Sequence, residues 1–279
     1  MIELTARLMP QMAPIAGLSE KVTISNGNNS ALFPRVNSTF SVQNPTEGDD
    51  IVTSSQLSLT STTISPTLRV VKVRISERAK YFSKEDILKL CSEELSRVHG
   101  QDLDTDLSAE FTNFASGNDT GTTNTDLTLA VLRTSRRLLQ ANTVANGGPA
   151  PDPIAVVLAP IPVENLLTNM GVQGAVAASN PYIPEGLSQQ LIKQYLVPGI
   201  NLVGVPVFWD GYLTEDGSGD FICAMFSKRG LQYAISKDWD MRTFEESEFV
   251  GVILRTVADY NSGVGKFSGH GSQVTADGA

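Results

Sequence analysis

The stretch from Val22 to Val71 constrains the fold of this chain more than any other. Its apolar residues recur mostly at every second position, with hydroxyl and amide side chains between them, which indicates extended chain with one covered face. A turn-forming cluster from Asn44 to Asp50 divides the stretch, as the tip of a long hairpin would. Because a two-stranded hairpin is only marginally stable in water, this one must pack on its own domain or on a neighbouring molecule.

The same stretch carries very little charge. Its charged residues are Arg35, Glu47, Asp49, Asp50 and Arg69, and it contains no lysine. A hairpin that stays exposed normally carries more charge, with lysine guarding its edges. Low charge with many hydroxyls favours a strand pair that buries its backbone edges against another chain. We therefore expect the hairpin tip, Glu47, Gly48, Asp49 and Asp50, to lie between subunits.

Length and charge limit the class of protein to which the chain can belong. The chain has 279 residues, enough for two closely joined domains. It has no run of about eighteen apolar residues, so we expect no membrane-spanning segment. The net charge of −9 argues against a protein that mainly grips phosphate backbones, but it is compatible with a container around nucleic acid. The first sixteen residues contain Pro10 and Pro14 and start without a basic run, which favours a docking arm over a secretion signal.

At Ser83 the period of the apolar pattern changes from two to 3.6. Ser83 and Asp86 are spaced as an N-cap hydroxyl and an acid three residues later, which predicts a helix start. The apolar stripe that follows predicts one long helix to about Phe114, roughly 45 Å long. A second helix is predicted over 125–142 and short helices over 163–169 and 186–195. Strands are predicted at 154–158, 204–209, 221–226 and 249–258.

Catalytic and metal-binding motifs are absent. The two histidines, His99 and His270, do not combine with cysteine or aspartate at a metal-ligand spacing. No Gly-x-Ser-x-Gly elbow is present. The alternating acids Asp102, Asp104 and Asp106 lack the glycine and the closing glutamate of a calcium loop, so we interpret them as a solvated helix face. We predict no catalytic residue, no cofactor, no metal and no enzymatic activity. The two cysteines, Cys91 and Cys223, fit buried free thiols.

The order of these elements resembles a known family. An arm, a hairpin with an acidic glycine-containing tip, a long capped helix, a compact α/β unit and a final long strand resemble the major capsid proteins of tailed bacteriophages. Their Hong Kong 97-type fold is shared with encapsulin shells. The stretches that resemble the family are Val71 to Ala79, Gly204 to Trp209, Phe226 to Ala234 and Val250 to Gly265. The resemblance spans most of Val36 to Gly265 and rests on arrangement, since no single motif is specific.

The resemblance implies an α+β fold with five parts. Residues 1–33 would be the N-terminal arm and 34–76 the extended loop, a β-hairpin that lies across the neighbouring subunit. Residues 77–125 would be the peripheral domain with its spine helix. Residues 126–240 would form the axial domain, and 241–279 the return strand of the peripheral domain and a C-terminal tail.

The resemblance also implies a function. The chain would self-assemble as pentamers and hexamers into the icosahedral head of a tailed phage. The shell would be built in the host cytoplasm and enclose double-stranded DNA without sequence-specific binding. We expect separate cement and scaffolding proteins. Some members of the family join subunits through a lysine on the extended loop. Here Lys21 and Lys72 flank the loop and none lies between them, so we predict no such crosslink.

Three other interpretations stay open at this point. An encapsulin-type bacterial compartment would have the same fold and enclose protein cargo. An α/β enzyme with an N-terminal extension would need a convergent polar site, which the two scattered histidines do not supply. A tail-tube or adhesin protein would be mostly β, whereas two long amphipathic helices are predicted here.

Overall fold

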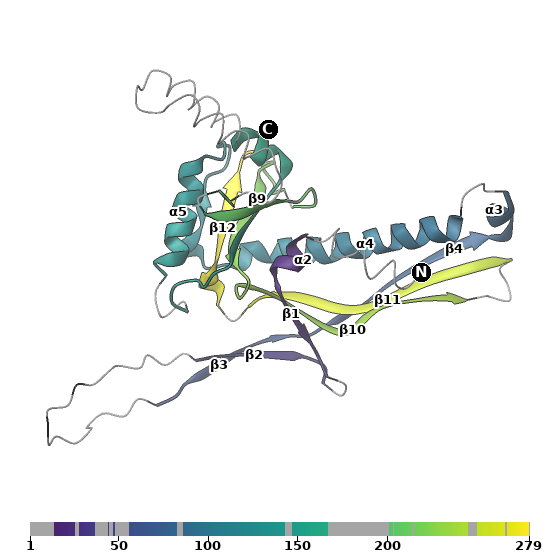
Figure 1. Ribbon diagram of the computed structural model, residues 1–279, viewed down its shortest axis with the longest axis horizontal. Coiled ribbons are helices and arrows are strands. Elements are labelled where there is room, and N and C mark those ends of the chain that lie inside the picture. The colour runs from purple at the N-terminus through teal and green to yellow at the C-terminus, as the bar shows by residue number, and fades with distance from the viewer. Residues whose placement is uncertain are drawn as a thin grey trace.

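The structure is a computed structural model of the whole chain. It describes residues 14–25, 28–36, 44, 47, 56–82, 86–142, 147–166, 201–202, 204–213, 215–244, 250–265 and 267–278. The described chain forms two sheets and a separate two-stranded hairpin, with one long helix along the first sheet (Figure 1). The fold is α+β, which confirms the predicted class.

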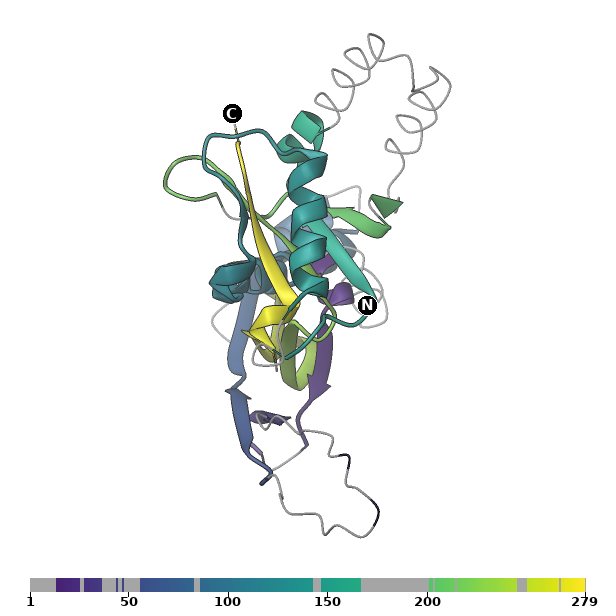
Figure 2. The ribbon, with the colours of Figure 1, turned by 90° about the vertical axis from the view of Figure 1, so that its left-hand side faces the viewer.

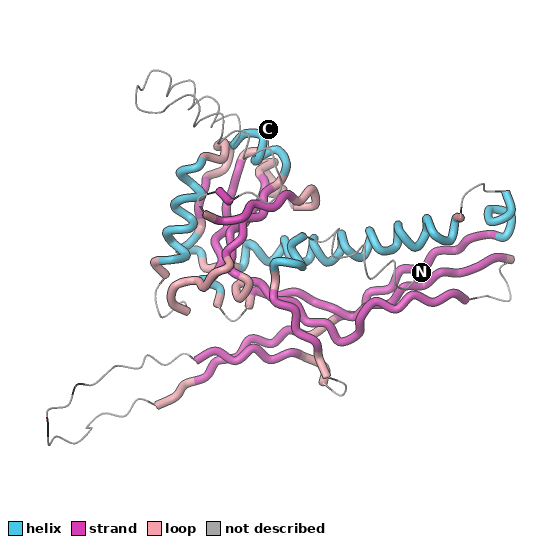
Figure 3. The backbone as a smooth tube through the Cα atoms, in the orientation of Figure 1, coloured by secondary structure: helices cyan, strands magenta, loops and turns pink. Residues whose placement is uncertain are grey.

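The first sheet is long and four-stranded, in the order β1-β10-β11-β4. These strands are β1 (Glu20–Thr23), β10 (Leu231–Phe244), β11 (Gly251–Val264) and β4 (Thr67–Ser76). Helix α4 (Ile87–Ala109) lies along one face of this sheet (Figures 1 and 3). The contact is a small apolar cluster of Ile75, Leu95, Met241 and Leu254. The opposite face of the sheet has no helix among the described elements (Figure 1).

Helix α4 confirms the predicted long helix but begins later than expected. A separate short helix, α3 (Glu77–Phe82), precedes it, and a 3₁₀ turn (Glu110–Asn113) extends it. The N-cap is Asp86, whose carboxylate accepts hydrogen bonds from the backbone N–H groups of Leu88 at 3.1 Å and Lys89 at 3.3 Å. The prediction of Ser83 as the cap with Asp86 inside the helix was therefore wrong. Ser83 itself lies outside the described residues.

The second sheet is six-stranded and contains most of the core. Its order is β5-β12-β9-β6-β8-β7. The strands are β5 (Thr120–Gly121), β12 (Gly271–Ala276), β9 (Phe221–Ser227), β6 (Ile154–Leu158), β8 (Val205–Trp209) and β7 (Asn201–Leu202). Every residue of β6 is buried. Helix α5 (Leu129–Gln140) packs against β12 and β9, and Figure 2 shows α5 alongside β12.

Several strands depart from the predicted domain boundaries. The strand Ala31–Val36 spans the boundary at residue 33, β4 belongs to the long sheet although it was assigned to the extended loop, and β5 belongs to the six-stranded sheet although it was assigned to the peripheral domain. The predicted axial domain ends at residue 240, whereas strand β10 continues past that residue to Phe244. Strand β12 pairs with β9 in the six-stranded sheet, although its residues were assigned to the return strand and tail. The small residues of β12 allow it to pair there. A Cβ on Gly271 would lie 2.1 Å from the Phe114 ring and would clash with it. The Ser272 hydroxyl donates to the carbonyl of Asn118 at 2.6 Å, so a polar strand is satisfied in the core.

The hairpin consists of β2 (Ala31–Val36) and β3 (Leu59–Ile64), paired antiparallel. Ala31 pairs with Ile64 and Val36 with Leu59, so every pair is centred in sequence between residues 47 and 48. That midpoint coincides with the predicted tip. Strand β3 leads through two residues into β4, so the hairpin is continuous with the edge of the long sheet.

Candidate assembly surface

An apolar cluster anchors the base of the hairpin to the molecule. Ile24, Phe33 and Ile64 are buried there in a cluster with Ala31 and with Ala234 of β10. Beyond this cluster, β2 and β3 lead away from both sheets (Figures 1 and 2). Outside this cluster, Arg35 of β2 lies over the ring of Phe267 at 5.2 Å.

The projecting part exposes apolar side chains. Leu32 is 65% exposed, Val36 49%, Leu57 57% and Leu59 60%. Clustered exposed apolar residues of this size indicate an interaction site. Of the predicted tip, Glu47 is described and is exposed, whereas Gly48, Asp49 and Asp50 lie outside the described residues. The described part of the arm thus leaves these four apolar side chains exposed, and their cover by another chain stays a prediction.

Arg69 fixes the base of the arm to the spine helix. Its guanidinium lies 2.6 Å from the Asp106 carboxylate and 3.5 Å from that of Asp102 on α4. The Tyr260 hydroxyl on β11 donates to Asp102 at 2.5 Å, and Arg69 lies over the Tyr260 ring at 5.7 Å. Burial and the neighbouring carboxylate of Asp102 raise the pKa of Tyr260. These groups lock β4, α4 and β11 together where the arm leaves the body.

The middle acid of the run, Asp104, is not solvated. Asp104 is fully buried at 0% exposure, so the interpretation of a solvated helix face was wrong for this residue. Burial, and then the charge of Asp210, raise the pKa of Asp104 to about 8, while the backbone N–H groups of Ala16 and Ile15 oppose the shift. Asp210 is also buried, and burial raises its pKa. The pair lies where the short N-terminal helix α2 (Pro14–Leu18) meets α4 and the end of β8.

A second exposed apolar group lies at the far end of the long sheet. Tyr81 and Phe82 at the end of α3 are 78% and 80% exposed, and Val250, just before β11, is 77% exposed. In Figure 1 this end is opposite the hairpin. The molecule is therefore elongated, with apolar side chains uncovered at both ends.

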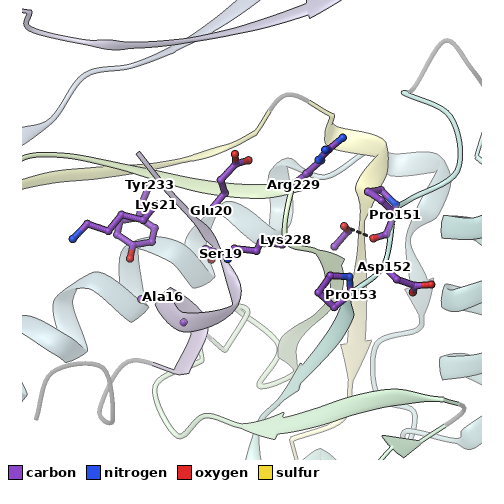
Figure 4. A pocket seen from close by; sticks show the side chains of 12 residues that line it. Ala16, Ser19, Glu20, Lys21, Pro151, Asp152, Pro153, Lys228, Arg229 and Tyr233 are labelled. Atoms are coloured by element: carbon purple, nitrogen blue, oxygen red, sulfur yellow. Dashed lines mark hydrogen bonds between the residues drawn. The ribbon is translucent and has the colours of Figure 1, made fainter. Parts of the chain in front are cut away.

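A polar cavity of about 570 Å³ lies between the N-terminal segment, the start of β6 and the β9–β10 turn. Figure 4 shows Lys21, Glu20, Asp152, Lys228 and Arg229 around it. These positively and negatively charged side chains do not surround a nucleophile or a general base. Among the described residues, no group of three metal-ligating side chains occurs. His99 is hydrogen-bonded to Thr256 at 2.7 Å, and His270 packs against the ring of Phe267.

The fold is that of the Hong Kong 97-type capsid proteins. The chain is similar to the capsid of Ralstonia phage GP4, with a TM-score of 0.71, 11% identity, and coverage of 93% of this chain and 87% of that one. It is similar to the head protein of Helicobacter pylori bacteriophage KHP40, with a TM-score of 0.68, 11% identity, and coverage of 96% and 92%.

The encapsulin SrpI of Synechococcus elongatus PCC 7942 matches with a TM-score of 0.65, 9% identity, and coverage of 95% and 87%. Tailed-phage capsids predominate among the similar structures. The sequence matches no protein-family model and no curated protein. The likeness therefore lies in the fold, and it confirms the predicted fold class. No helix among the described residues is long and apolar enough to cross a membrane.

Proposed function

We propose that this chain is the major capsid protein of a tailed bacteriophage. It self-assembles as pentamers and hexamers into an icosahedral head that encloses double-stranded DNA. The observation that carries this proposal is the projecting hairpin, whose leucines and valine are about half or more exposed among the described residues. A closed symmetric shell covers them in every subunit, because a head-to-tail contact repeated around a ring leaves no free end.

The two sheets support the proposed domain division, with adjustments. Residues 1–33 are the N-terminal arm, and the extended loop is 34–66 instead of 34–76, because β4 (Thr67–Ser76) pairs in the long sheet. The long sheet with α4 is the peripheral domain, and it includes all of β10. The six-stranded sheet with α5 is the axial domain, and it includes β12. The arm of one subunit lies across the peripheral domain of the next.

The shell is held without covalent crosslinks. Lys21 and Lys72 flank the extended loop and no lysine lies on it. Separate cement and scaffolding proteins supply further rigidity and guide assembly, which takes place in the host cytoplasm before the protein becomes part of the virion. With a net charge of −9, the wall encloses DNA without sequence-specific binding.

An encapsulin-type compartment is the second candidate, because one of the similar structures is an encapsulin. The two candidates differ in contents. Phage heads hold nuclease-protected DNA, whereas encapsulin shells hold protein. A role as an enzyme has no support among the described residues, where no nucleophile, base and orienting group converge.

The test is to express the full chain, alone and with its neighbouring genes, and to image the product by electron microscopy. Hexamers, pentamers or closed shells with nuclease-protected DNA support the proposal. Shells that hold protein and no DNA support the encapsulin alternative. A compact monomer in all conditions contradicts both. On a denaturing gel, intact particles are expected to give one monomer band, and a ladder contradicts the absence of crosslinks.

A further inference from the structure

Two buried acids lie together beneath the N-terminal segment. Asp104 of α4 is fully buried, and Asp210, just after β8, is 3% exposed. One Asp210 oxygen accepts a hydrogen bond from the backbone N–H of Tyr212 at 2.9 Å, and the other has no partner among the described residues. Two carboxyl groups in such a site cannot both ionise at low cost. The site therefore favours the state in which one carboxyl group carries a proton.

The cover over this acid pair is a short stretch of chain, residues 14–24, which we call the strap. It begins with α2, whose Ile15 is fully buried in the main core. The backbone N–H groups of Ile15 and Ala16 lie at the Asp104 carboxyl group and oppose the rise in its pKa. Strand β1 continues the strap along β10, and Ile24 ends it in the cluster at the base of the hairpin. Figure 1 shows this path from α4 towards the hairpin.

The other charged groups around the strap do not take the place of this proton. Helix α2 has no titratable side chain, and the charge that acts on Asp104 is that of Asp210. Charged side chains of β1 and α4 near the pair are bound elsewhere: Glu20 to Gln232, Lys21 to Asp238, and Arg97 to Glu94 and Tyr212. Asp152, Lys228 and Arg229 face the strap across the polar cavity and are exposed to solvent, which screens them. Protonation of the acid pair therefore decides whether the strap covers an extra buried charge.

We propose that residues 14–24 form a strap that is closed while the acid pair holds a proton and opens when both carboxyl groups are ionised. The proton leaves to solvent, and the open strap lets water reach Asp104. In the closed strap the pKa of Asp104 is about 8, against an ordinary value of 3.8. Between these values the closed form binds one proton more than the open form. The opening constant should therefore rise about tenfold per pH unit in this window and level off above about pH 8.

Opening of the strap also reaches the hairpin. The Ile24 N–H donates to the carbonyl of Ile235 on β10 at 2.8 Å, and the Ile24 side chain is buried with Phe33 and Ile64 at the hairpin base. Release of the strap removes one of the side chains that hold this base. A proton on the acid pair thus controls how firmly the hairpin is anchored. The inference goes beyond the proposed function, because it concerns a single subunit and does not need a shell.

Amide hydrogen exchange on the full chain, measured at pH 6 and pH 8 and corrected for the intrinsic exchange rate, tests the strap. In the wild type, the protection of residues 19–24 should fall about fiftyfold from pH 6 to pH 8. At both values the strap should be at least about tenfold less protected than β6, because it opens while the core stays folded. Asp104→Asn keeps a neutral side chain of the same shape, so the protection of its strap should change less than about twofold. Glu93→Gln on the same helix is the matched control and should behave as the wild type.

Asp210→Asn supplies a second variant in case Asp104→Asn does not fold. Without the neighbouring charge, Asp104 ionises more readily in the closed strap, so the fall in protection should be smaller than in the wild type. A wild-type strap with the same protection at both pH values, or a fall of wild-type size in either variant, would overturn the inference. So would equal protection of the strap and β6, which would report unfolding of the whole subunit. The proposed function is tested separately, since it fails only if the full chain forms no capsomers or shells.

Discussion

The six-stranded sheet and the hairpin are both rich in apolar residues, yet they differ in where their cover comes from. Strand β6 is buried along its whole length, between β9 and β8 and within the main core. The hairpin has a buried base and an exposed outer half. The first region is completed by its own chain, whereas in the proposed function the second is covered by another chain. Substitutions in the first are therefore expected to change folding, and substitutions in the second to change assembly.

The largest effect is expected when one substitution in the core is compared with one in the hairpin. Phe226→Ala removes a fully buried ring that packs on Phe111 and Phe114, which should lower the free energy of unfolding by about 3–5 kcal/mol. Leu59→Ala on the hairpin should change it by less than about 0.5 kcal/mol and still reduce shell yield. Denaturant unfolding and sedimentation measure the two quantities. If Leu59→Ala destabilised the subunit as much as Phe226→Ala, the hairpin would be part of the subunit core.

The next largest effect is expected at the buried acid Asp104, on the pH dependence of stability. Its pKa rises from 3.8 to about 8 in the folded chain, so the native state keeps a proton that the unfolded chain loses between these values. Stability should therefore fall as the pH rises from about 4 towards 8. Asp104→Asn should flatten this slope and add on the order of 1–3 kcal/mol at pH 8. Thermal unfolding at pH 5 and pH 8 measures it. An unchanged slope would contradict the buried placement, and Glu93→Gln, at a half-buried position of the same helix, is a suitable control.

Arg69 links the two kinds of region, and its loss should have a smaller effect. Arg69→Ala removes the ion pair to Asp106 and the contact to Tyr260, and should cost about 1–2 kcal/mol. Because the side chain is one-third exposed, solvent screening limits the loss. The hairpin should also be held less firmly in its direction. Shell yield should therefore fall by more than the loss of stability alone would cause. A loss of stability without any loss of yield would show that Arg69 does not orient the arm.

The helix cap gives the smallest effect. Asp86→Ala removes the side-chain acceptor for two N–H groups at the start of α4 and should cost about 1 kcal/mol. The control Lys89→Ala, also exposed in the first turn, should stay within about 0.5 kcal/mol. Equal effects of the two would argue against Asp86 as the cap.

The sequence predicted those parts of the fold whose signals are local. The period-two pattern of the hairpin and the 3.6-residue stripe of α4 each follow from one covered face, and both elements are present. The predicted start of α4 was too early because a separate short helix, α3, lies just before α4 in the chain. Strand β12 was missed because its small and polar residues have no apolar alternation, and its partner β9 lies far away in sequence.

The run of acids shows how helical geometry decides burial. Asp102 and Asp106 are four residues apart, so they share one helix face and both reach Arg69. Asp104 lies between them on the opposite side, where α2 and the end of β8 cover it. That cover depends on a segment some ninety residues earlier in the chain, which no local pattern could reveal. Likewise, the register of three strands is needed to see that Arg242, Arg255 and Lys72 are directly opposite one another in the long sheet.

Sedimentation velocity on a matched pair of chains measures directly whether the projecting arm joins one subunit to the next. In the shortened chain, residues 37–58 are replaced by an Asn-Gly turn, which joins the directly paired Val36 and Leu59 and keeps the buried base. The account predicts that the intact chain forms capsomers and shells while the shortened chain remains a folded monomer. Shells of normal size from the shortened chain would contradict it, because the projecting arm would then not be what joins one subunit to the next.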